Sequence, residues 1–238
     1  MHKEKFDIIS LAPSASRYFP SSMEKEDWMG DEYVKFTDLE IPLGHSRYGG
    51  PVIDLPEDVP FPSGMRFAAQ LDLSEISKHD NSRLLPGNGQ LIFFSDMMTD
   101  TGKVFYSREP NENLHRQIVE HEDNFWDGVL IDRIWSDTES WEDRFRVPED
   151  DWERKRVNEQ GLIWDEFAGS NKSKLFGIFT HCQLGESEIE NIINSEKIVL
   201  LQIGEAGFND EGVFSVLISK DDLKNLNFES CEFHWAQS

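Results

Sequence analysis

The chain has 238 residues, of which 46 are Asp or Glu and 23 are Lys or Arg, so its formal net charge at pH 7 is −23. A charge of this size repels nucleic-acid phosphates and anionic membrane surfaces, so we expect neither as a partner. The same charge attracts basic proteins, polyamines and cations. The chain contains 17 Phe and has ample length to form a hydrophobic core.

The two cysteines, Cys182 and Cys231, lie far apart and have neither the density of a disulfide scaffold nor the spacing of a metal site. The first apolar run is short and is interrupted by Asp7, which makes it a poor secretion signal. No apolar run approaches the roughly 20 residues that span a bilayer. We therefore expect a cytoplasmic protein.

Residues 1–48 mix single aromatic residues with acids and show no strong period. We expect one or two helices here, with Pro13 and Pro20 as breaks. The next segment, residues 48–62, contains four prolines, and a proline cannot donate a ladder hydrogen bond. It is therefore predicted to be an extended connection without regular strand pairing.

Residues 67–73 alternate as a strand does, with Phe67 and Leu71 on one face and Gln70 on the other. Asp72, followed three residues later by Glu75, has the form of a helix-capping box, so a short helical turn is expected next. Turn residues 86–89 then lead into an apolar run, and residues 104–106 form a further short strand. This block is typical of an antiparallel meander.

The C-terminal part repeats this arrangement of short elements. A capping box at residues 187–190 predicts a short helix, and apolar strands are expected at 198–203 and 213–218. Ser219 and the acids that follow it predict a second short helix around Leu223. Residues 231–235 alternate as a last strand.

Gln70 and Gln202 each occupy the fourth place of an apolar run, and in both cases a glycine then opens a second apolar run. This match predicts an internal duplication. The expected fold class is α+β, with one twisted, largely antiparallel sheet built from two duplicated halves with short helices. A single domain, residues 1–238, would comprise a helical or irregular segment 1–48, a first half 49–110, an acidic Trp-rich insert 111–173 and a second half 174–238.

The middle of the chain, residues 120–166, combines acids with five of the seven tryptophans. Tryptophan is favoured at the energetic centres of interfaces, and carboxylates around it attract a basic partner. Alternatively, the tryptophans cover an open face of the sheet while the acids keep that cover soluble. The predicted partner-binding residues are Trp126, Trp135, Trp141, Trp152, Asp150 and Asp151.

Several segments resemble the YwqG-like family of bacterial proteins, which is known chiefly as a domain of unknown function. These segments are 49–51, 67–72, 86–94, 200–202 and 210–212, and they span most of the region from Tyr48 to Trp235. The resemblance implies one compact α+β domain with an internally duplicated, largely antiparallel sheet, and it implies no established reaction, cofactor or catalytic residue. Phe61-Pro62 departs from the tryptophan before proline that is usual in the family, and the usual proline after Gly177 is absent.

The glutamines at matching places suggest a candidate ligand site between the two halves, formed by Gln70, Asp72, Gln202 and Asp210. A small-molecule binder or a hydrolase would use such a pocket. The alternative is structural, because a buried amide must find hydrogen-bond partners and each glutamine can satisfy backbone groups where strands meet.

Motifs for catalysis or cofactor binding give no further support to an enzyme. No two histidines have the i, i+4 spacing of a helical zinc site, and His115 and His121 fit a solvated charged face. Neither a phosphate-binding loop nor a nucleophile elbow is present. We expect no cofactor, no metal and no catalytic residue.

The expected function is a non-enzymatic binding protein, such as an antitoxin or immunity-type partner of a basic protein. Besides the small-molecule binder or hydrolase, a structural subunit that buries its aromatic middle against a second copy is a further alternative.

Overall fold

The computed structural model describes residues 5–26, 32–57, 59–96, 99–121, 124–140, 172–181, 183–204, 207 and 212–236. The strands are β1 (Lys5–Phe19), β2 (Glu32–Lys35), β3 (Arg47–Tyr48), β4 (Val52–Leu55), β5 (Arg66–Asp72), β6 (Gln90–Asp96), β7 (Thr101–Ser107), β8 (His115–Ile118), β9 (Gly128–Ser140), β10 (Lys174–Phe176), β11 (Lys197–Ile203), β12 (Val213–Ser219) and β13 (Glu232–Ala236). The helices are α1 (Leu73–Ile76), α2 (Glu186–Ile193) and α4 (Lys220–Lys224), with 3-10 turns at η1 (Phe36–Asp38), η2 (Ser77–His79), η3 (Asn111–Asn113) and η7 (Phe228–Ser230).

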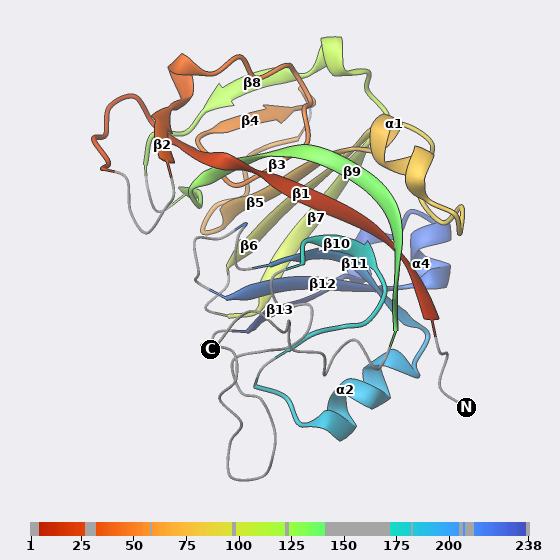
Figure 1. The fold of residues 1–238 in the computed structure, drawn as a ribbon. Coiled ribbons are helices and arrows are strands. Elements are labelled where there is room, and N and C mark those ends of the chain that lie inside the picture. The colour runs from red at the N-terminus through yellow and green to blue at the C-terminus, as the bar shows by residue number, and fades with distance from the viewer. Residues whose placement is uncertain are drawn as a thin grey trace, which may run out of the picture.

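Eleven of these strands form one sheet, in the order β13-β12-β11-β10-β1-β9-β3-β5-β6-β7 with β2 beside β1. The strand pairings are antiparallel except that of β1 with β2. The two long strands β1 and β9 lie side by side at the centre, and the two shorter sets of strands extend from them (Figure 1). β4 and β8 form a separate two-stranded sheet.

The large sheet curls into a nearly closed barrel whose two edge strands, β7 and β13, approach each other. Across this seam, Asp100 Oδ1 accepts a hydrogen bond of 2.9 Å from the backbone N–H of Trp235. Gly102 of β7 lies so close to Phe233 of β13 that a Cβ atom there would overlap the aromatic ring. A glycine at this position is therefore what lets the edges meet.

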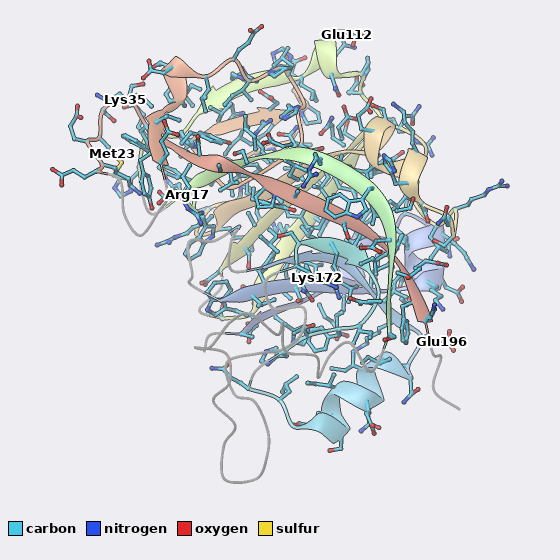
Figure 2. All side chains as sticks on the ribbon, in the orientation of Figure 1. Arg17, Met23, Lys35, Glu112, Lys172 and Glu196 are labelled. Carbon is cyan, nitrogen blue, oxygen red and sulfur yellow. The ribbon has the colours of Figure 1, made fainter. Side chains whose placement is uncertain are left out.

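Side chains fill the space that the curved sheet encloses (Figure 2). Both halves of the sheet contribute to this core, and α1 and α4, which lie next to each other in Figure 1, add Leu73, Ile76 and Leu223. No helix in the described part of the chain is long and apolar enough to cross a membrane.

Each half of the sheet also has a covering layer on its outer face. Over the first half, Ile53 and Leu55 of β4 pack with Phe67 and Phe94. Over the second half, Ile189 of α2 packs with Phe179, Val199 and Leu217. The fold is thus a mostly antiparallel sheet with a few short helices.

The helix expected in the N-terminal segment is wrong for residues 5–19, which form the strand β1. Buried Ile8, Ile9 and Leu11 lie in this strand, which pairs with β9 on one side and with β10 and β2 on the other. Pro13 falls between two shifts in the β1–β9 register, where its missing N–H is tolerated. Tertiary pairing decides the conformation of a segment whose local pattern was weak.

The proline-rich segment also contains regular pairing, contrary to the expectation from its composition. Val52–Leu55 pairs with β8 over four residues, and Pro51 and Pro56 stand just outside the strand. Prolines at strand ends cost no ladder hydrogen bond. Likewise the expected insert, residues 111–173, contains β9, which is a central strand of the sheet rather than an addition to it.

The hairpins β5–β6 and β11–β12 have the same register. Gln70 pairs with Ile92 and Gln202 pairs with Ser215, each partner lying three residues after a glycine, Gly89 or Gly212, of positive φ. Each hairpin has a register shift two residues before its glutamine, between Phe67 and Ala69 and between Val199 and Leu201. Because of this bulge, Phe67 packs under β4 and not, as the alternation predicted, with Ala69 and Leu71 in the main core.

The short strands β3 and β10 match in the same way. Arg47 of β3 pairs with Gln70, and Lys174 of β10 pairs with Gln202. The chain then leaves the sheet through two residues of positive φ. They are Gly49 and Gly50 directly after β3, and Phe176, the last residue of β10, with Gly177.

A serine before each of these strands makes the same hydrogen bond. Ser46 Oγ accepts from the backbone N–H of Asp72 at 2.9 Å, and Ser173 Oγ accepts from that of Gly204 at 3.0 Å. Asp72 and Gly204 each lie two residues after the glutamine of their half.

Candidate functional site

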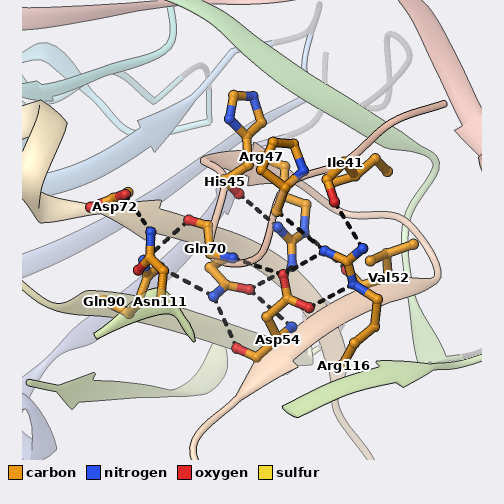
Figure 3. A network of polar contacts seen from close by, with 12 residues as sticks. Ile41, His45, Arg47, Val52, Asp54, Gln70, Asp72, Gln90, Asn111 and Arg116 are labelled. Atoms are coloured by element: carbon orange, nitrogen blue, oxygen red, sulfur yellow. Dashed lines mark hydrogen bonds and ion pairs between the residues drawn. The ribbon is translucent and has the colours of Figure 1, made fainter. Parts of the chain in front are cut away.

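Gln70 lies on β5 with its side chain fully buried under β4 (Figure 3). Its Oε1 accepts hydrogen bonds from Arg47 Nη2 at 2.7 Å and from the Asp54 N–H at 3.1 Å. Its Nε2 donates to the Asp54 carbonyl at 2.9 Å and to Gln90 Oε1 at 3.1 Å. Both amide donors and both acceptor positions are thus used within the protein, as the structural alternative expects.

The Gln70 amide belongs to a buried charged network. The Arg47 guanidinium and the Asp54 carboxylate form an ion pair of 2.9 Å in which both side chains have an exposed fraction of 0%. Arg116 of β8 closes the network from outside, with Nε 2.8 Å from Asp54 Oδ1 and Nη2 3.0 Å from Oδ2. Burial alone would raise the pKa of Asp54, but the hydrogen bonds from Arg116 and the charge of Arg47 outweigh it and hold this pKa below its ordinary value.

Asp72, a predicted site residue, is the N-cap of α1. Its Oδ1 accepts from the Ser74 N–H at 2.8 Å, and its Oδ2 accepts from Asn111 Nδ2 at 2.8 Å. The carboxylate therefore begins a helix and holds η3 against the sheet. The capping turn predicted after this strand is confirmed by α1.

Gln202 lies on β11, also fully buried, and its Nε2 donates to the Lys172 carbonyl at 2.9 Å. Strands β3, β9, β1 and β10 stand between the strands of the two glutamines in the sheet order. Gln70 and Gln202 consequently lie in different polar clusters. The fourth predicted ligand residue, Asp210, lies outside the described residues.

The neighbours of Gln202 along the sheet are polar. The register places Lys174 on one side of it and Ser215, followed by His234, on the other. The matching positions of the first half hold apolar Ile92 and Phe105 in place of Ser215 and His234. The His234 ring lies 6.1 Å from that of His181 at an interplanar angle of 90°.

The environment of these two rings favours their neutral form. Burial lowers the pKa of His181, and the charge of His234 lowers it further. Burial likewise lowers the pKa of His234. Burial raises the pKa of Cys231 to about 12, so this thiol stays protonated. In the described residues, no three His, Cys, Asp or Glu side chains form a group that could hold a metal ion.

The predicted tryptophans fall into three groups. Trp126 packs against the core and stacks on Trp235, with ring centres 6.0 Å apart, while the Arg66 guanidinium lies 4.4 Å from the Trp126 ring centre. Trp135 of β9 is instead 38% exposed, and the Arg133 guanidinium lies 5.6 Å from its ring centre. The remaining predicted partner-binding residues, Trp141, Trp152, Asp150 and Asp151, lie outside the described residues.

Two hollows were not anticipated from the sequence, because each draws its walls from separate segments. One of about 630 Å³ is lined by three glutamates, Glu57, Glu109 and Glu112, together with Asn113, Leu114 and His115. The other, of about 460 Å³, lies between the first residues of β1, the end of β10, α2 and the start of β11. Its lining includes Phe6, Phe176, Phe179, Ile192, Val199 and Leu217.

A comparison with protein-family models matches residues 46–236 to the family described as "Domain of unknown function (DUF1963)". The matched region begins at Ser46, just before β3, and ends with β13, so it contains both hairpins that share a register. A search of the curated proteins finds no match.

Proposed function

As the chain belongs to the DUF1963 family, whose description assigns no activity, we propose from its charge and surface that it is a non-enzymatic cytoplasmic protein that binds a basic protein partner. The single observation that carries this proposal is the acidic hollow beside β8 in a chain of net charge −23. Long-range attraction would bring a basic partner to the surface, and the hollow would receive one of its Lys or Arg side chains.

The chemistry of the acidic hollow suits a basic side chain. Glu57, Glu109 and Glu112 are exposed. They come from the segment that follows β4 and the segment that precedes β8, which meet at one end of the β4–β8 sheet because Leu55 pairs with His115. Carboxylates bind guanidinium or ammonium groups with charge-assisted hydrogen bonds. Strand β8, whose first residue His115 lines the hollow, also ends in an apolar side chain, Ile118, which is 41% exposed.

Trp135 supplies a second contact for a partner in this proposal. It is one of the two large apolar side chains that are exposed in the described part of the chain. Asp132 and Asp137, on the same strand, are exposed acids. A strand that exposes both a tryptophan and carboxylates suits a binding surface for a basic protein.

The remaining partner-binding residues, Trp141, Trp152, Asp150 and Asp151, stay part of the proposal. An antitoxin or immunity-type role is the form of partner binding that we propose, because such proteins neutralise a basic partner through a complementary acidic surface. We extend the proposal to membership of the YwqG-like bacterial proteins, on the segments that carry that resemblance.

We also propose that the two halves arose by duplication of one sheet unit. The shared register, the shared bulge, the paired residues of positive φ and the two serine hydrogen bonds support this proposal. A chance resemblance between two hairpins would not be expected to extend to the strand that lies beside each of them in the sheet, which is β3 or β10.

Affinity capture from a lysate at low and raised salt tests the proposed function. We expect a basic protein to be retained at about 50 mM salt and released at several hundred millimolar, because salt screens exposed charges. The variant Glu57→Gln/Glu109→Gln/Glu112→Gln should retain less of it. If every retained protein binds equally well at both salt concentrations, the proposal fails.

A matched control variant distinguishes an effect of the glutamates in the hollow from an effect of the total net charge on binding. Glu40→Gln/Glu196→Gln/Glu229→Gln removes the same three charges from exposed positions outside the hollow. Figure 2 shows Glu112 and Glu196 at well-separated places on the molecule. The control variant should retain the partner nearly as well as the original protein does.

A further inference from the structure

The short strand β10 leaves a gap in the sheet. Its described register on β11 consists of one residue pair, Lys174 with Gln202, after which the chain turns away at Phe176 and Gly177. On its other side β11 pairs with β12 from Lys197 onward. The cavity of about 460 Å³ lies at this gap, with Ile198 and Val199 in its wall. In the described residues no strand pairs with β11 there, and an open strand edge is a template for another strand.

The first half has the matching gap, and the chain itself fills it. The strand β3 turns away at Gly49 and Gly50, and beyond this turn Phe125 pairs with Phe67 of β5 in a parallel bridge. The Trp126 carbonyl accepts a hydrogen bond from the Gly50 N–H, and Phe125 is only 5% exposed. A bridging residue with an aromatic side chain, Phe125, is therefore what fills this place beside β5 in the first half.

Val199 in the cavity wall corresponds to Phe67, because each lies three residues before the glutamine of its half. The filling segment of the first half directly precedes β9. In the second half β1 takes the place of β9, because Lys174 pairs with Ser10 as Arg47 pairs with Leu130. The residues that match Phe125 and Trp126 are then Lys5 and Phe6, but these stay paired with Ser140 and Glu139 of β9. They therefore do not fill the gap beside Val199.

We propose that the gap beside Val199 binds an extended segment of a partner protein that carries an aromatic side chain between basic residues. Its backbone would add to the edge of β11, as Phe125 adds to β5. Its aromatic side chain would contact Phe179, Ile192 and Leu217. Flanking basic residues fit the net charge of the protein and Asp7 in the cavity lining. Lys197, which pairs with Glu232 at 2.5 Å, and Lys220 also line the cavity.

The proposal rests on the proposed function for the identity of the protein that carries the segment, and a free peptide tests it separately. The probe is a fluorescein-labelled, terminally blocked peptide Lys-Asn-Phe-Trp-Lys, which places the residues of the first-half filler between lysines. Fluorescence anisotropy should show saturable binding to the full chain. The same peptide with two serines in place of Phe and Trp should bind at least tenfold more weakly.

Two protein variants locate the binding site. Ile193→Trp adds bulk to the cavity wall and should weaken binding of the aromatic peptide at least tenfold. Asn191→Trp places the same bulk on an exposed position of α2 outside that wall and should change affinity less than twofold. Hydrogen exchange on the original protein gives a readout without substitution, since bound peptide should slow exchange of backbone amides within 197–200.

No saturable binding up to about 1 mM peptide would overturn the proposal, and so would equal binding of the serine peptide. The proposal would also be overturned if Ile193→Trp bound the aromatic peptide as well as the original protein does and the peptide did not slow amide exchange in residues 197–200. If lysate capture fails while the peptide binds as described, the proposed function fails and the peptide site stands.

Discussion

The ammonium group of Lys174 donates hydrogen bonds to both carboxylate oxygens of Glu139, at 2.6 and 2.7 Å. A third bond of 2.9 Å goes to the carbonyl of Ile178, so every N–H of the ammonium group has an acceptor. The two side chains are 1% and 6% exposed. The pair ties the end of β9 to β10 and to the turn that follows it.

Replacing one member of the Lys174–Glu139 pair should destabilise the folded protein. Lys174→Met leaves the Glu139 carboxylate buried without its counter-ion, so we expect the free energy of unfolding to fall by about 3–5 kcal/mol. Lys174→Met/Glu139→Leu should recover most of this loss, because a buried ion pair is often replaceable by apolar residues. Urea denaturation of the two variants measures both values, and a double variant as unstable as the single one would contradict this account.

The pH dependence of stability should reflect His181 and His234. The pKa values of His181 and His234 are lowered below 6.5 in the folded protein, so between the folded pKa and 6.5 the unfolded chain binds more protons. The free energy of unfolding should therefore rise with pH across this window. The stability that the two neutral histidines contribute should be lost as the pH falls through the same window.

His181→Gln/His234→Gln should flatten this dependence between pH 5 and 7 in urea denaturation. An unchanged slope in the double variant would show that other groups set the dependence.

The positive-φ glycine before β6 should not tolerate a side chain. Gly89 has φ +96°, and a Cβ atom there would overlap the Ser107 carbonyl oxygen. We expect Gly89→Ala to lower the free energy of unfolding by about 1–3 kcal/mol. Gly87→Ala is a close control, because a Cβ at Gly87 meets no atom within 4 Å. Equal stabilities of the two variants would contradict the strain assigned to Gly89.

Trp126 and Trp135 should differ in how much each contributes to the free energy of unfolding. Trp126→Ala removes a ring that packs against the core and stacks on Trp235, so a loss of about 3 kcal/mol in the free energy of unfolding is expected. Trp135→Ala removes an exposed ring and should change stability by no more than about 0.5–1 kcal/mol. Thermal and urea denaturation compare them, and a larger loss from Trp135→Ala would assign that ring to folding.

Much of the fold could be predicted where local patterns are strong. The apolar runs around Gln70 and Gln202 predicted the strands that became β5 and β11, and Ser219 does cap α4, accepting from the Asp222 N–H at 3.0 Å. The helix predicted from the 187–190 capping box is also present as α2, although it begins earlier, after Gly185. Period-2 and capping signals act within a few residues, so a sequence displays them directly.

The errors lie where distant pairing determines structure. Nothing local to residues 5–19 specifies β9 as a neighbour, and β9 itself lies in a segment whose acids and tryptophans suggested an insert. The bulge between Phe67 and Ala69 is likewise invisible to a count of alternating residues.

The candidate site could be anticipated only in part. Matching positions for the two glutamines were visible in the sequence, but their charged neighbours were not, because Asp54 and Arg116 come from segments that pair only in the fold. The acidic hollow and the gap beside Val199 draw their walls from separate segments, so no single motif marks them.

The most direct test of the central claim is the dissociation constant of the captured partner at about 50 and 300 mM salt. It should be measured for the original protein, for Glu57→Gln/Glu109→Gln/Glu112→Gln and for its charge-matched control. The account expects the partner to bind at least tenfold more weakly at the higher salt concentration. It also expects weaker binding by Glu57→Gln/Glu109→Gln/Glu112→Gln than by the original protein, and no such loss in the control. A dissociation constant that is indifferent to salt, or equal for the two triple variants, would contradict recognition of a basic partner at this hollow.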